Sequence, residues 1–254
     1  MKSLKSFNLT YYRIDSTPST NNLLSQILKT EKLQTGFVVV SDFQTAGRGL
    51  AENSWEAERG KNLTFSILFR PENLTVDKNF ILSQASSLAV KSVLDDYLPK
   101  NSIEKFKIKW SNDIYFGEKK ICGILIENNF KGNQITYSII GIGLNINQIN
   151  FKSDAPNPIS LSQIVGEEIE NLDEILEKIC RKIIFFLSNN NNYKNLKSQY
   201  FNALYRNDGF YFYKTKDNEV FSAKIAEIQD DGRLILETSE GQKRGFYFKE
   251  VVFV

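Results

Sequence analysis

The chain has 254 residues, with 32 lysine and arginine residues against 30 aspartate and glutamate residues, two cysteines and no histidine. Because imidazole is absent, the sequence excludes a Ser-His-Asp or Cys-His nucleophile, an H-E-x-x-H zinc site and a histidine pH switch. A net charge of +2 is too small to indicate a nucleic-acid partner by itself.

Cysteine content and hydropathy bear on the compartment. The two cysteines, Cys122 and Cys180, are too few for a four-cysteine zinc site or a disulfide framework, which favours a reducing compartment. The first 15 residues lack the continuous apolar stretch of a secretory signal. No later segment approaches the roughly 18 apolar residues of a membrane span. We therefore expect a soluble, cytoplasmic protein.

The N-terminal part reads as strands and one helix around a long loop. Alternation and apolar runs predict strands over residues 7–14, 37–41 and 63–69, and Ser19 or Thr20 is expected to cap the helix that follows the first strand. Residues 43–62 are polar, contain glycine and show neither period. Because this stretch is longer than an ordinary connection, we expect a functional loop.

The central part alternates long helices with strands. Apolar side chains at helical spacing predict helices over residues 78–98 and 172–187. Strands are predicted over 106–110, 121–127 and 135–143, with a turn at Phe116-Gly117-Glu118. The prediction is an α+β fold, with a central, mostly antiparallel sheet flanked by helices. The asparagine run at 189–192 is interpreted as a bias in composition.

From Gly209 onward the pattern changes to short alternating strands separated by turn residues, which suggests a small β-barrel. We place the domain boundary between residues 1–205 and 206–254. Small barrels can bind nucleic acid, but residues 209–254 carry seven basic against eight acidic side chains. This balance lacks the electrostatic footprint expected for a phosphate backbone.

Several short motifs have a functional and an ordinary interpretation. Gly47-Arg48-Gly49 can present amides and a guanidinium to an anion, or be a flexible turn. Lys109, Asn112 and Asp113 at a strand end, with Lys120 after the next turn, can grip a nucleotide and its metal ion, or form a solvated strand end. The glycines at 123, 141 and 143 can admit a ligand or mark bulges and tight packing. For Trp55 and Trp110, core packing is the default.

The order and spacing of the motifs change this balance. Along the chain they are Ser19-Thr20-Asn21, Gln44-Thr45-Ala46-Gly47-Arg48-Gly49, Ser54-Trp55, Gly60-Lys61-Asn62-Leu63, Lys109-Trp110-x-Asn112-Asp113, Lys120-x-x-Gly123-Ile124-Leu125-x-Glu127 and Gly141-x-Gly143-x-Asn145. Together they resemble the biotin protein ligase family. The resemblance implies a class II aminoacyl-tRNA synthetase/biotin ligase-like catalytic domain over 1–205 and an SH3-like barrel over 206–254, with Lys249-Glu250-Val251 at its closing strand.

The resemblance also implies an activity and its partners. Family members use ATP and Mg²⁺ to convert biotin to biotinyl-5′-AMP, and then transfer biotin to a lysine of a biotin carboxyl carrier domain. Residues 1–18 are too few for the helix-turn-helix of relatives that act as repressors, so we expect the form without that domain and no DNA binding. The family often forms homodimers through sheet edges, and the sequence leaves the oligomeric state open.

Site roles follow by match to the motifs. Lys120, Arg48 and Asp113 are the expected catalytic residues, and Asp113 is also the expected Mg²⁺ ligand and a candidate to receive the proton of the acceptor lysine. Biotin is expected to contact Ser19, Thr20, Asn21, Gln44, Gly47, Arg48, Lys120 and Gly123. ATP and the adenylate are expected to contact Arg48, Gly49, Trp55, Asn112, Asp113, Lys120 and Asn145.

The chain departs from the family pattern at two places. Leu50-Ala51-Glu52-Asn53 stands where many members continue the glycine loop with further arginine and glycine, so we expect faster loss of the adenylate. Ser111 stands where proline is usual, which mainly frees the local backbone.

Three other functions compete with this interpretation. A lipoate or octanoate ligase or transferase would need a pocket for an apolar chain end, which fits poorly with Ser19, Thr20 and Gln44. A non-catalytic biotin- or nucleotide-binding module would not need Lys120, Arg48 and Asp113, all of which are present. An RNA-binding protein would be expected to carry more positive charge.

Overall fold

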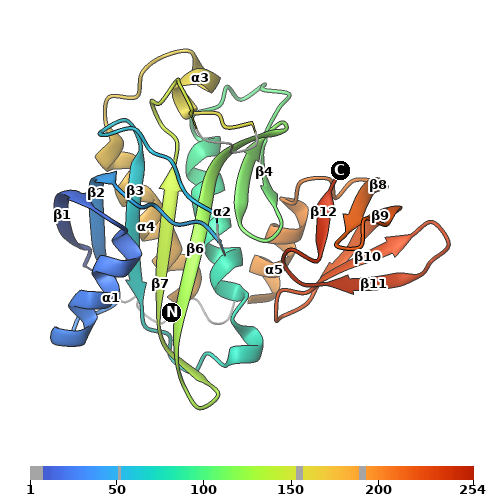
Figure 1. Cartoon of the computed structure of the whole chain (residues 1–254), viewed down its shortest axis with the longest axis horizontal. Coiled ribbons are helices and arrows are strands. Elements are labelled where there is room, and N and C mark those ends of the chain that lie inside the picture. The colour runs from blue at the N-terminus through green and yellow to red at the C-terminus, as the bar shows by residue number, and fades with distance from the viewer. Residues whose placement is uncertain (1–7, 51–52, 153–156, 189–192) are drawn as a thin grey trace.

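The computed structural model describes residues 8–50, 53–152, 157–188 and 193–254. Its larger sheet has seven strands in the order β1-β2-β3-β7-β6-β5-β4 (Figure 1). The bounds are β1 Thr10–Thr17, β2 Phe37–Gln44, β3 Leu63–Phe69, β4 Phe106–Lys109, β5 Asp113–Phe116, β6 Lys119–Lys131 and β7 Gln134–Leu144. Only the β1–β2 pair of this sheet is parallel, so the predicted α+β fold with a mostly antiparallel sheet is confirmed.

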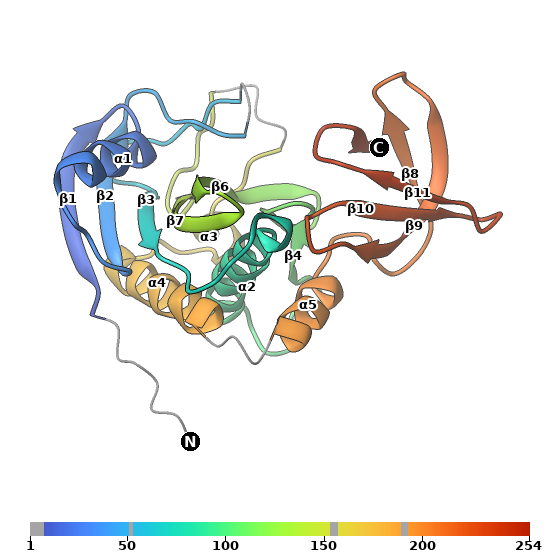
Figure 2. The same ribbon diagram turned by 90° about the horizontal axis from the view of Figure 1, so that it is seen from below.

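Helices cover both faces of the sheet, because successive side chains of a strand point to opposite faces and apolar residues occur on both. Val38 and Val40 of β2 point into the main core, whereas Val39 between them packs with Leu24 of helix α1 (Thr20–Thr30). Helices α2 (Ile81–Asp95) and α4 (Leu172–Ser188) pack on each other across the main-core face, opposite α1 (Figure 2). The remaining helical segments are η1 (Val76–Lys78), α3 (Leu161–Val165) and α5 (Tyr193–Asn202).

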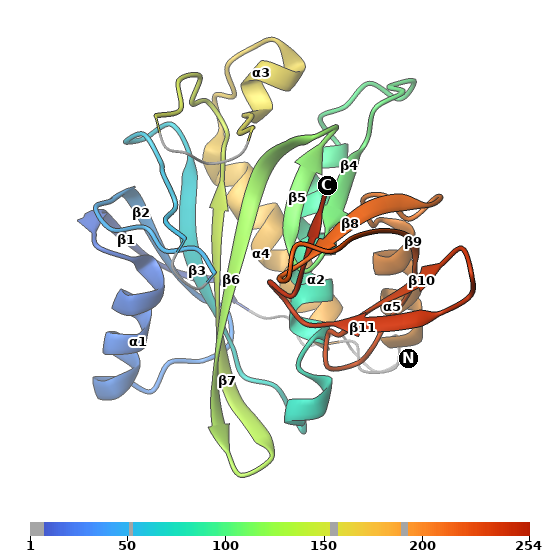
Figure 3. The same cartoon turned by 45° about the vertical axis from the view of Figure 1, so that its right-hand side comes forward.

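A second, five-stranded antiparallel sheet follows α5, in the order β11-β10-β9-β8-β12. Its strands are β8 Tyr211–Thr215, β9 Val220–Ile228, β10 Leu234–Thr238, β11 Lys243–Phe246 and β12 Val251–Phe253. This sheet lies beside β4 and β5 (Figure 3), where the Trp110 indole N–H donates to the Gly232 carbonyl at 3.0 Å. The described pairing joins neighbouring strands and does not join β11 to β12.

Several predicted elements differ from the structure. The first strand covers Thr10–Thr17 instead of 7–14, and Phe7 lies outside the described residues, as does the asparagine run at 189–192. The first long helix is shorter than predicted. Residues after Trp110 form a strand of their own, β5, and α5 was not predicted, because its small apolar face gives a weak periodic signal.

Candidate functional site

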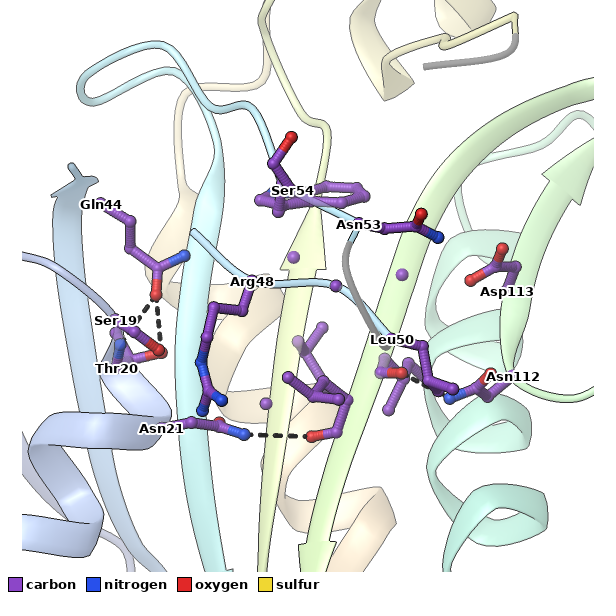
Figure 4. Close-up of a pocket in the computed structure, with 18 of the residues that line it drawn as sticks. Ser19, Thr20, Asn21, Gln44, Arg48, Leu50, Asn53, Ser54, Asn112 and Asp113 are labelled. Carbon is purple, nitrogen blue, oxygen red and sulfur yellow. Dashed lines mark hydrogen bonds between the residues drawn. The ribbon is translucent and has the colours of Figure 1, made fainter. Parts of the chain in front are cut away.

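A pocket opens on the face of the large sheet that carries α1 (Figure 4). Its lining comes from the start of α1, the loop after β2, the β4–β5 turn, the middle of β6 and β7, and one residue of the C-terminal sheet region. The lining residues are Ser19, Thr20, Asn21, Gln44, Arg48, Gly49, Leu50, Asn53, Ser54, Trp55, Ser111, Asn112, Asp113, Lys120, Gly123, Ile124, Leu125, Gly141, Ile142, Gly143 and Phe248.

Gly123, Gly141 and Gly143 form a glycine floor at this pocket, where the side chains of Trp55 and Asn21 lie directly on the sheet. Gly123 of β6 lies opposite Gly143 of β7, and Gly141 lies opposite Ser66 of β3, so three of these four positions on the pocket face carry no side chain. A Cβ on Gly143 would lie 2.3 Å from Cε2 of Trp55. The indole therefore lies directly on the backbone of Gly143. The sequence left open whether this glycine admits another group or marks a bulge, and the structure shows that it admits the Trp55 ring.

The loop after β2 folds back over the sheet as a short two-stranded arch. The Trp55 amide donates to the Gly47 carbonyl at 2.8 Å, and the Gly49 amide donates to the Asn53 carbonyl at 2.6 Å. Arg48 and Ser54 form the bridge between the two arms. This arch holds Arg48 and Trp55 over the pocket, and Ala51 and Glu52 of the predicted departure lie outside the described residues.

The α1 side of the pocket is a buried polar wall. Ser19 caps α1 by accepting from the Asn22 amide, and Ser19, Thr20 and Asn21 are each 3% exposed. The Gln44 carbonyl oxygen accepts from the Thr20 amide at 2.8 Å and from the Thr20 hydroxyl at 3.2 Å. No hydrogen bond within the described part of the chain uses the Gln44 amide nitrogen, so this donor is available to a ligand.

The opposite side carries the lysine predicted to be catalytic. The Lys120 ammonium lies 2.7 Å from a carboxylate oxygen of Asp113 and 5.8 Å from the centre of the Trp55 ring. The backbone of Lys120 is held from both sides, because its amide donates to Asn157 and its carbonyl accepts from Ile159, each at 2.9 Å. A cation and a carboxylate thus face the polar wall across the glycine floor.

The β4–β5 turn positions Asp113. Asn112 is buried and donates its side-chain amide to the Ile124 carbonyl, while the Ser111 hydroxyl donates to Asn112 at 2.6 Å. Tyr200 of α5 donates its hydroxyl to the Ser111 carbonyl. The prediction that Lys109 helps to grip a nucleotide here is wrong, because its ammonium lies over the rings of Tyr115 and Phe253 instead of in the pocket. Burial lowers the pKa of this lysine.

Most of the predicted site residues meet in this pocket, and two do not. Gly47 lies behind the lining, where a Cβ would approach the Trp55 carbonyl oxygen to 2.5 Å. Asn145 donates to the Ile159 carbonyl at 3.2 Å and so ties β7 to the segment before α3. Its side-chain oxygen is buried without a partner among the described residues.

Sequence reasoning missed other groups at the site. Phe248 follows β11, belongs to the C-terminal sheet region and gave no signal in its own segment. Ser66 lies in an apolar strand and was not distinguished from its neighbours, although its hydroxyl contacts Thr20 and Asn21. Glu127 ends one of the motifs, and the sequence predicts no role for it.

Comparison with known proteins decides the family. The model of the biotin/lipoate A/B protein ligase family matches residues 13–145, a range that holds the motifs from Ser19 to Asn145. The chain belongs to the biotin/lipoate A/B protein ligase family.

Relatives of this biotin/lipoate ligase family member span bacteria and plants. It is 31% identical over 218 residues to the bifunctional ligase/repressor BirA of Bacillus subtilis, a match that covers 82% of this chain and 64% of that protein. It is 35% identical over 131 residues to biotin–protein ligase 2 of Arabidopsis thaliana, covering 50% of this chain and 38% of the relative. The chain thus spans less than two thirds of the length of either protein.

The fold of this family member is shared with a solved structure. A biotin protein ligase from Aquifex aeolicus, in complex with biotin and ATP, superimposes with a TM-score of 0.77 at 24% identity, covering 98% of this chain and 99% of that one. Within the described part of the chain, no helix is long and apolar enough to cross a membrane. Across those same residues, no group of three or more acidic, cysteine or histidine side chains could hold a metal ion.

Proposed function

We propose that this chain is a biotin protein ligase, which activates biotin with ATP and transfers it to a lysine of a biotin carboxyl carrier domain. The observation that carries this proposal is one pocket with a buried polar wall at one side and the Lys120–Asp113 pair at the other. The names of its relatives in bacteria and plants support the same activity.

Substrate choice follows from the polar wall. A ureido ring has two N–H donors and a carbonyl acceptor, and Ser19, Thr20 and Gln44 offer hydroxyl groups and a free amide N–H to match them. Leaving such groups unpaired in a buried pocket costs about 1–3 kcal/mol each. We assign Asn21, Gly47 and Gly123 to the same subsite, Gly47 by supporting the arch.

The first step needs no base. The biotin carboxylate, ionised at neutral pH, attacks the α-phosphorus of ATP, the bond to the bridging oxygen breaks, and pyrophosphate leaves with that electron pair. Catalysis then rests on placement and charge. Lys120 is assigned to bridge the carboxylate and the α-phosphate, and Arg48 with the Gly49 amide is assigned to the phosphate.

The nucleotide side is assigned to the β4–β5 turn. Asn112 lines this side of the pocket and is held by its hydrogen bond to the Ile124 carbonyl, and Trp55 covers the glycine floor. Asn145 does not line the pocket and acts by holding the segment around Ile159. Asp113 is the single carboxylate of the described lining. Because Mg²⁺ is usually held by one or two carboxylates together with substrate phosphates, Asp113 fits as its protein ligand. The ion would neutralise phosphate charge.

In the second step the amine of the acceptor lysine attacks the carbonyl carbon of biotinyl-5′-AMP, and AMP leaves as an amide forms. The amine must be neutral to attack, whereas an unperturbed lysine is almost wholly protonated near pH 7. We assign Asp113 to receive or orient this proton. The carrier domain is therefore the proposed protein partner. We also propose a homodimer as the assembly.

We further propose two domains, 1–205 for catalysis and 206–254 as an SH3-like barrel, in a cytoplasmic protein. In support, the buried side chains of the C-terminal sheet alternate along its strands, with Tyr213, Ile225, Leu236 and Phe246 inside. Phe248 brings this unit to the rim of the pocket.

Release of pyrophosphate tests the proposed function. With ATP and Mg²⁺ present, we expect the wild-type protein to release pyrophosphate on addition of biotin and not on addition of lipoate, because lipoate offers an apolar ring to the polar wall. Release with lipoate alone would reassign the chain to the lipoate branch of the family. Release with neither would indicate a binding module without catalysis.

Leu50 provides a separate prediction about the adenylate. Leu50 lines the pocket at the position where the family pattern has further positive charge. We expect Leu50→Arg to slow the release of biotinyl-5′-AMP about threefold or more, because a guanidinium there attracts the phosphate. A chase of the bound adenylate measures this rate, Leu50→Met is the uncharged control, and equal release from wild type and Leu50→Arg would contradict the prediction.

A further inference from the structure

Glu127 lies next to the pocket without lining it. On β6 it points to the same face as Gly123 and Leu125, because strand residues two apart share a face. Its neighbour across the sheet is Ile139 of β7, which packs under α1. Glu127 thus lies on the pocket face of β6, four residues beyond Gly123.

A continuous set of hydrogen bonds connects Glu127 to the polar wall. Asn21 donates its amide to a Glu127 carboxylate oxygen at 2.7 Å. The Ser66 hydroxyl lies 2.6 Å from the Asn21 carbonyl oxygen and 2.7 Å from the Thr20 hydroxyl. Thr20 in turn donates to Gln44. Asn21 and Ser66 are buried, so this chain of contacts has few alternative partners.

The other end of this network is Arg48. One guanidinium nitrogen, Nη2, donates to both Glu127 carboxylate oxygens, at 2.9 and 3.0 Å. In Figure 4 the Arg48 side chain extends from the arch toward Asn21. No hydrogen bond between described residues uses Nη1 or Nε of Arg48. Glu127 therefore binds only Nη2 of the guanidinium group, and the N–H donors on Nη1 and Nε of Arg48 remain for a ligand.

We propose that Glu127 is a positioning residue, which orients Arg48 so that its free donors meet the anionic part of the ligand, and which couples that orientation to the ureido-binding wall. This inference rests on the proposed function of the site. Both side chains of the pair are 40% exposed, so the contact adds little to folding stability. Its effect is expected in ligand retention, where holding a guanidinium in one orientation reduces the entropic cost of binding.

The test is a cycle of variants read by the rate at which bound biotinyl-5′-AMP is released. Glu127→Gln keeps an acceptor for Asn21 but removes the charge that holds Arg48. We expect it to release the adenylate about three- to tenfold faster than wild type, with a KM for biotin raised by a similar factor and little change in kcat. In an Arg48→Ala background, the same substitution should change release by less than about twofold, because its target is gone.

Two further variants complete the experiment. Glu219→Gln breaks another arginine–glutamate pair, in which Arg244 donates to both Glu219 carboxylate oxygens at 2.8 Å in the C-terminal sheet, and its release rate should match wild type. Glu127→Asp retains the charge at shorter reach, so its release rate should lie between those of wild type and Glu127→Gln, and it serves the test if Glu127→Gln does not fold.

The outcomes separate this inference from the proposed function. Wild-type release rates from both Glu127 variants, or equal effects of Glu127→Gln with and without Arg48, would overturn the positioning role alone. A wild-type protein that releases no pyrophosphate with biotin would overturn both proposals.

Discussion

Lys120→Ala is expected to lower biotin-dependent pyrophosphate release about 100-fold or more, since removing one group that stabilises developing charge typically costs about 10²–10³ in rate. Among the described residues that line the pocket, Lys120 is the one lysine, and its Nζ lies 2.7 Å from Oδ2 of Asp113. Alanine would leave the carboxylate of biotin and the α-phosphate without a shared cation. It would also leave Asp113 without its ion-pair partner, so that two like charges would meet when ATP binds.

The neighbouring lysine offers a matched control. Lys119 precedes Lys120 on β6, is exposed and does not line the pocket. Lys119→Ala should therefore release pyrophosphate at the wild-type rate. Binding of biotin, measured by calorimetry, should survive Lys120→Ala in weakened form because the polar wall is intact. Pyrophosphate release within about twofold of wild type would remove Lys120 from the mechanism.

Gly143→Ala is expected to raise the KM for biotin and for ATP about tenfold or more. The new methyl group would lie 2.3 Å from Cε2 of Trp55, closer than any Cβ contact allows. The backbone has little freedom to retreat, because Gly143 is paired with Thr64 on one side and Gly123 on the other. The indole must therefore leave its place on the floor and enter the space that the ligand needs.

Tryptophan fluorescence checks this displacement directly. The chain has two tryptophans, and Trp110 is buried beneath the C-terminal sheet, so a change in emission on Gly143→Ala reports on Trp55. Gly209→Ala is the control, because the nearest atom to a Cβ there lies at 3.9 Å and its backbone is not left-handed. An unchanged emission spectrum together with wild-type KM values would show that the floor accommodates a methyl group.

Local patterns predicted much of the scaffold. The helices around Leu24, Leu82 and Ile179 and the strands of both sheets other than β5 were recognised, because each buries one face and so repeats its apolar residues at the period of its secondary structure. The prediction was poorest for segments that are stabilised by contacts with other elements of the fold. Asp113–Phe116 becomes a strand by pairing with β4 and β6, and α5 is held by contacts such as that of Tyr200 with the β4–β5 turn.

The same division applies to the site. Motif residues such as Lys120, Arg48 and Gln44 could be nominated from the sequence, because their order and spacing match those of a known family. Glu127, Ser66 and Phe248 could not be given roles, since each contacts residues that are distant along the chain. Their roles depend on strand register and on how the C-terminal sheet packs.

The sequence by itself determined the chemical inventory of this protein: no imidazole, two isolated thiols, a glycine-bearing loop and a set of spaced polar motifs. Only the tertiary structure decided how these groups meet, because register places Gly123 against Gly143 and so opens the floor that Trp55 covers. It also turned Asn145 to a neighbouring segment and joined Arg48 to Glu127. Side-chain chemistry is carried by each residue alone, whereas distances between distant residues arise from backbone pairing and core packing across the whole fold.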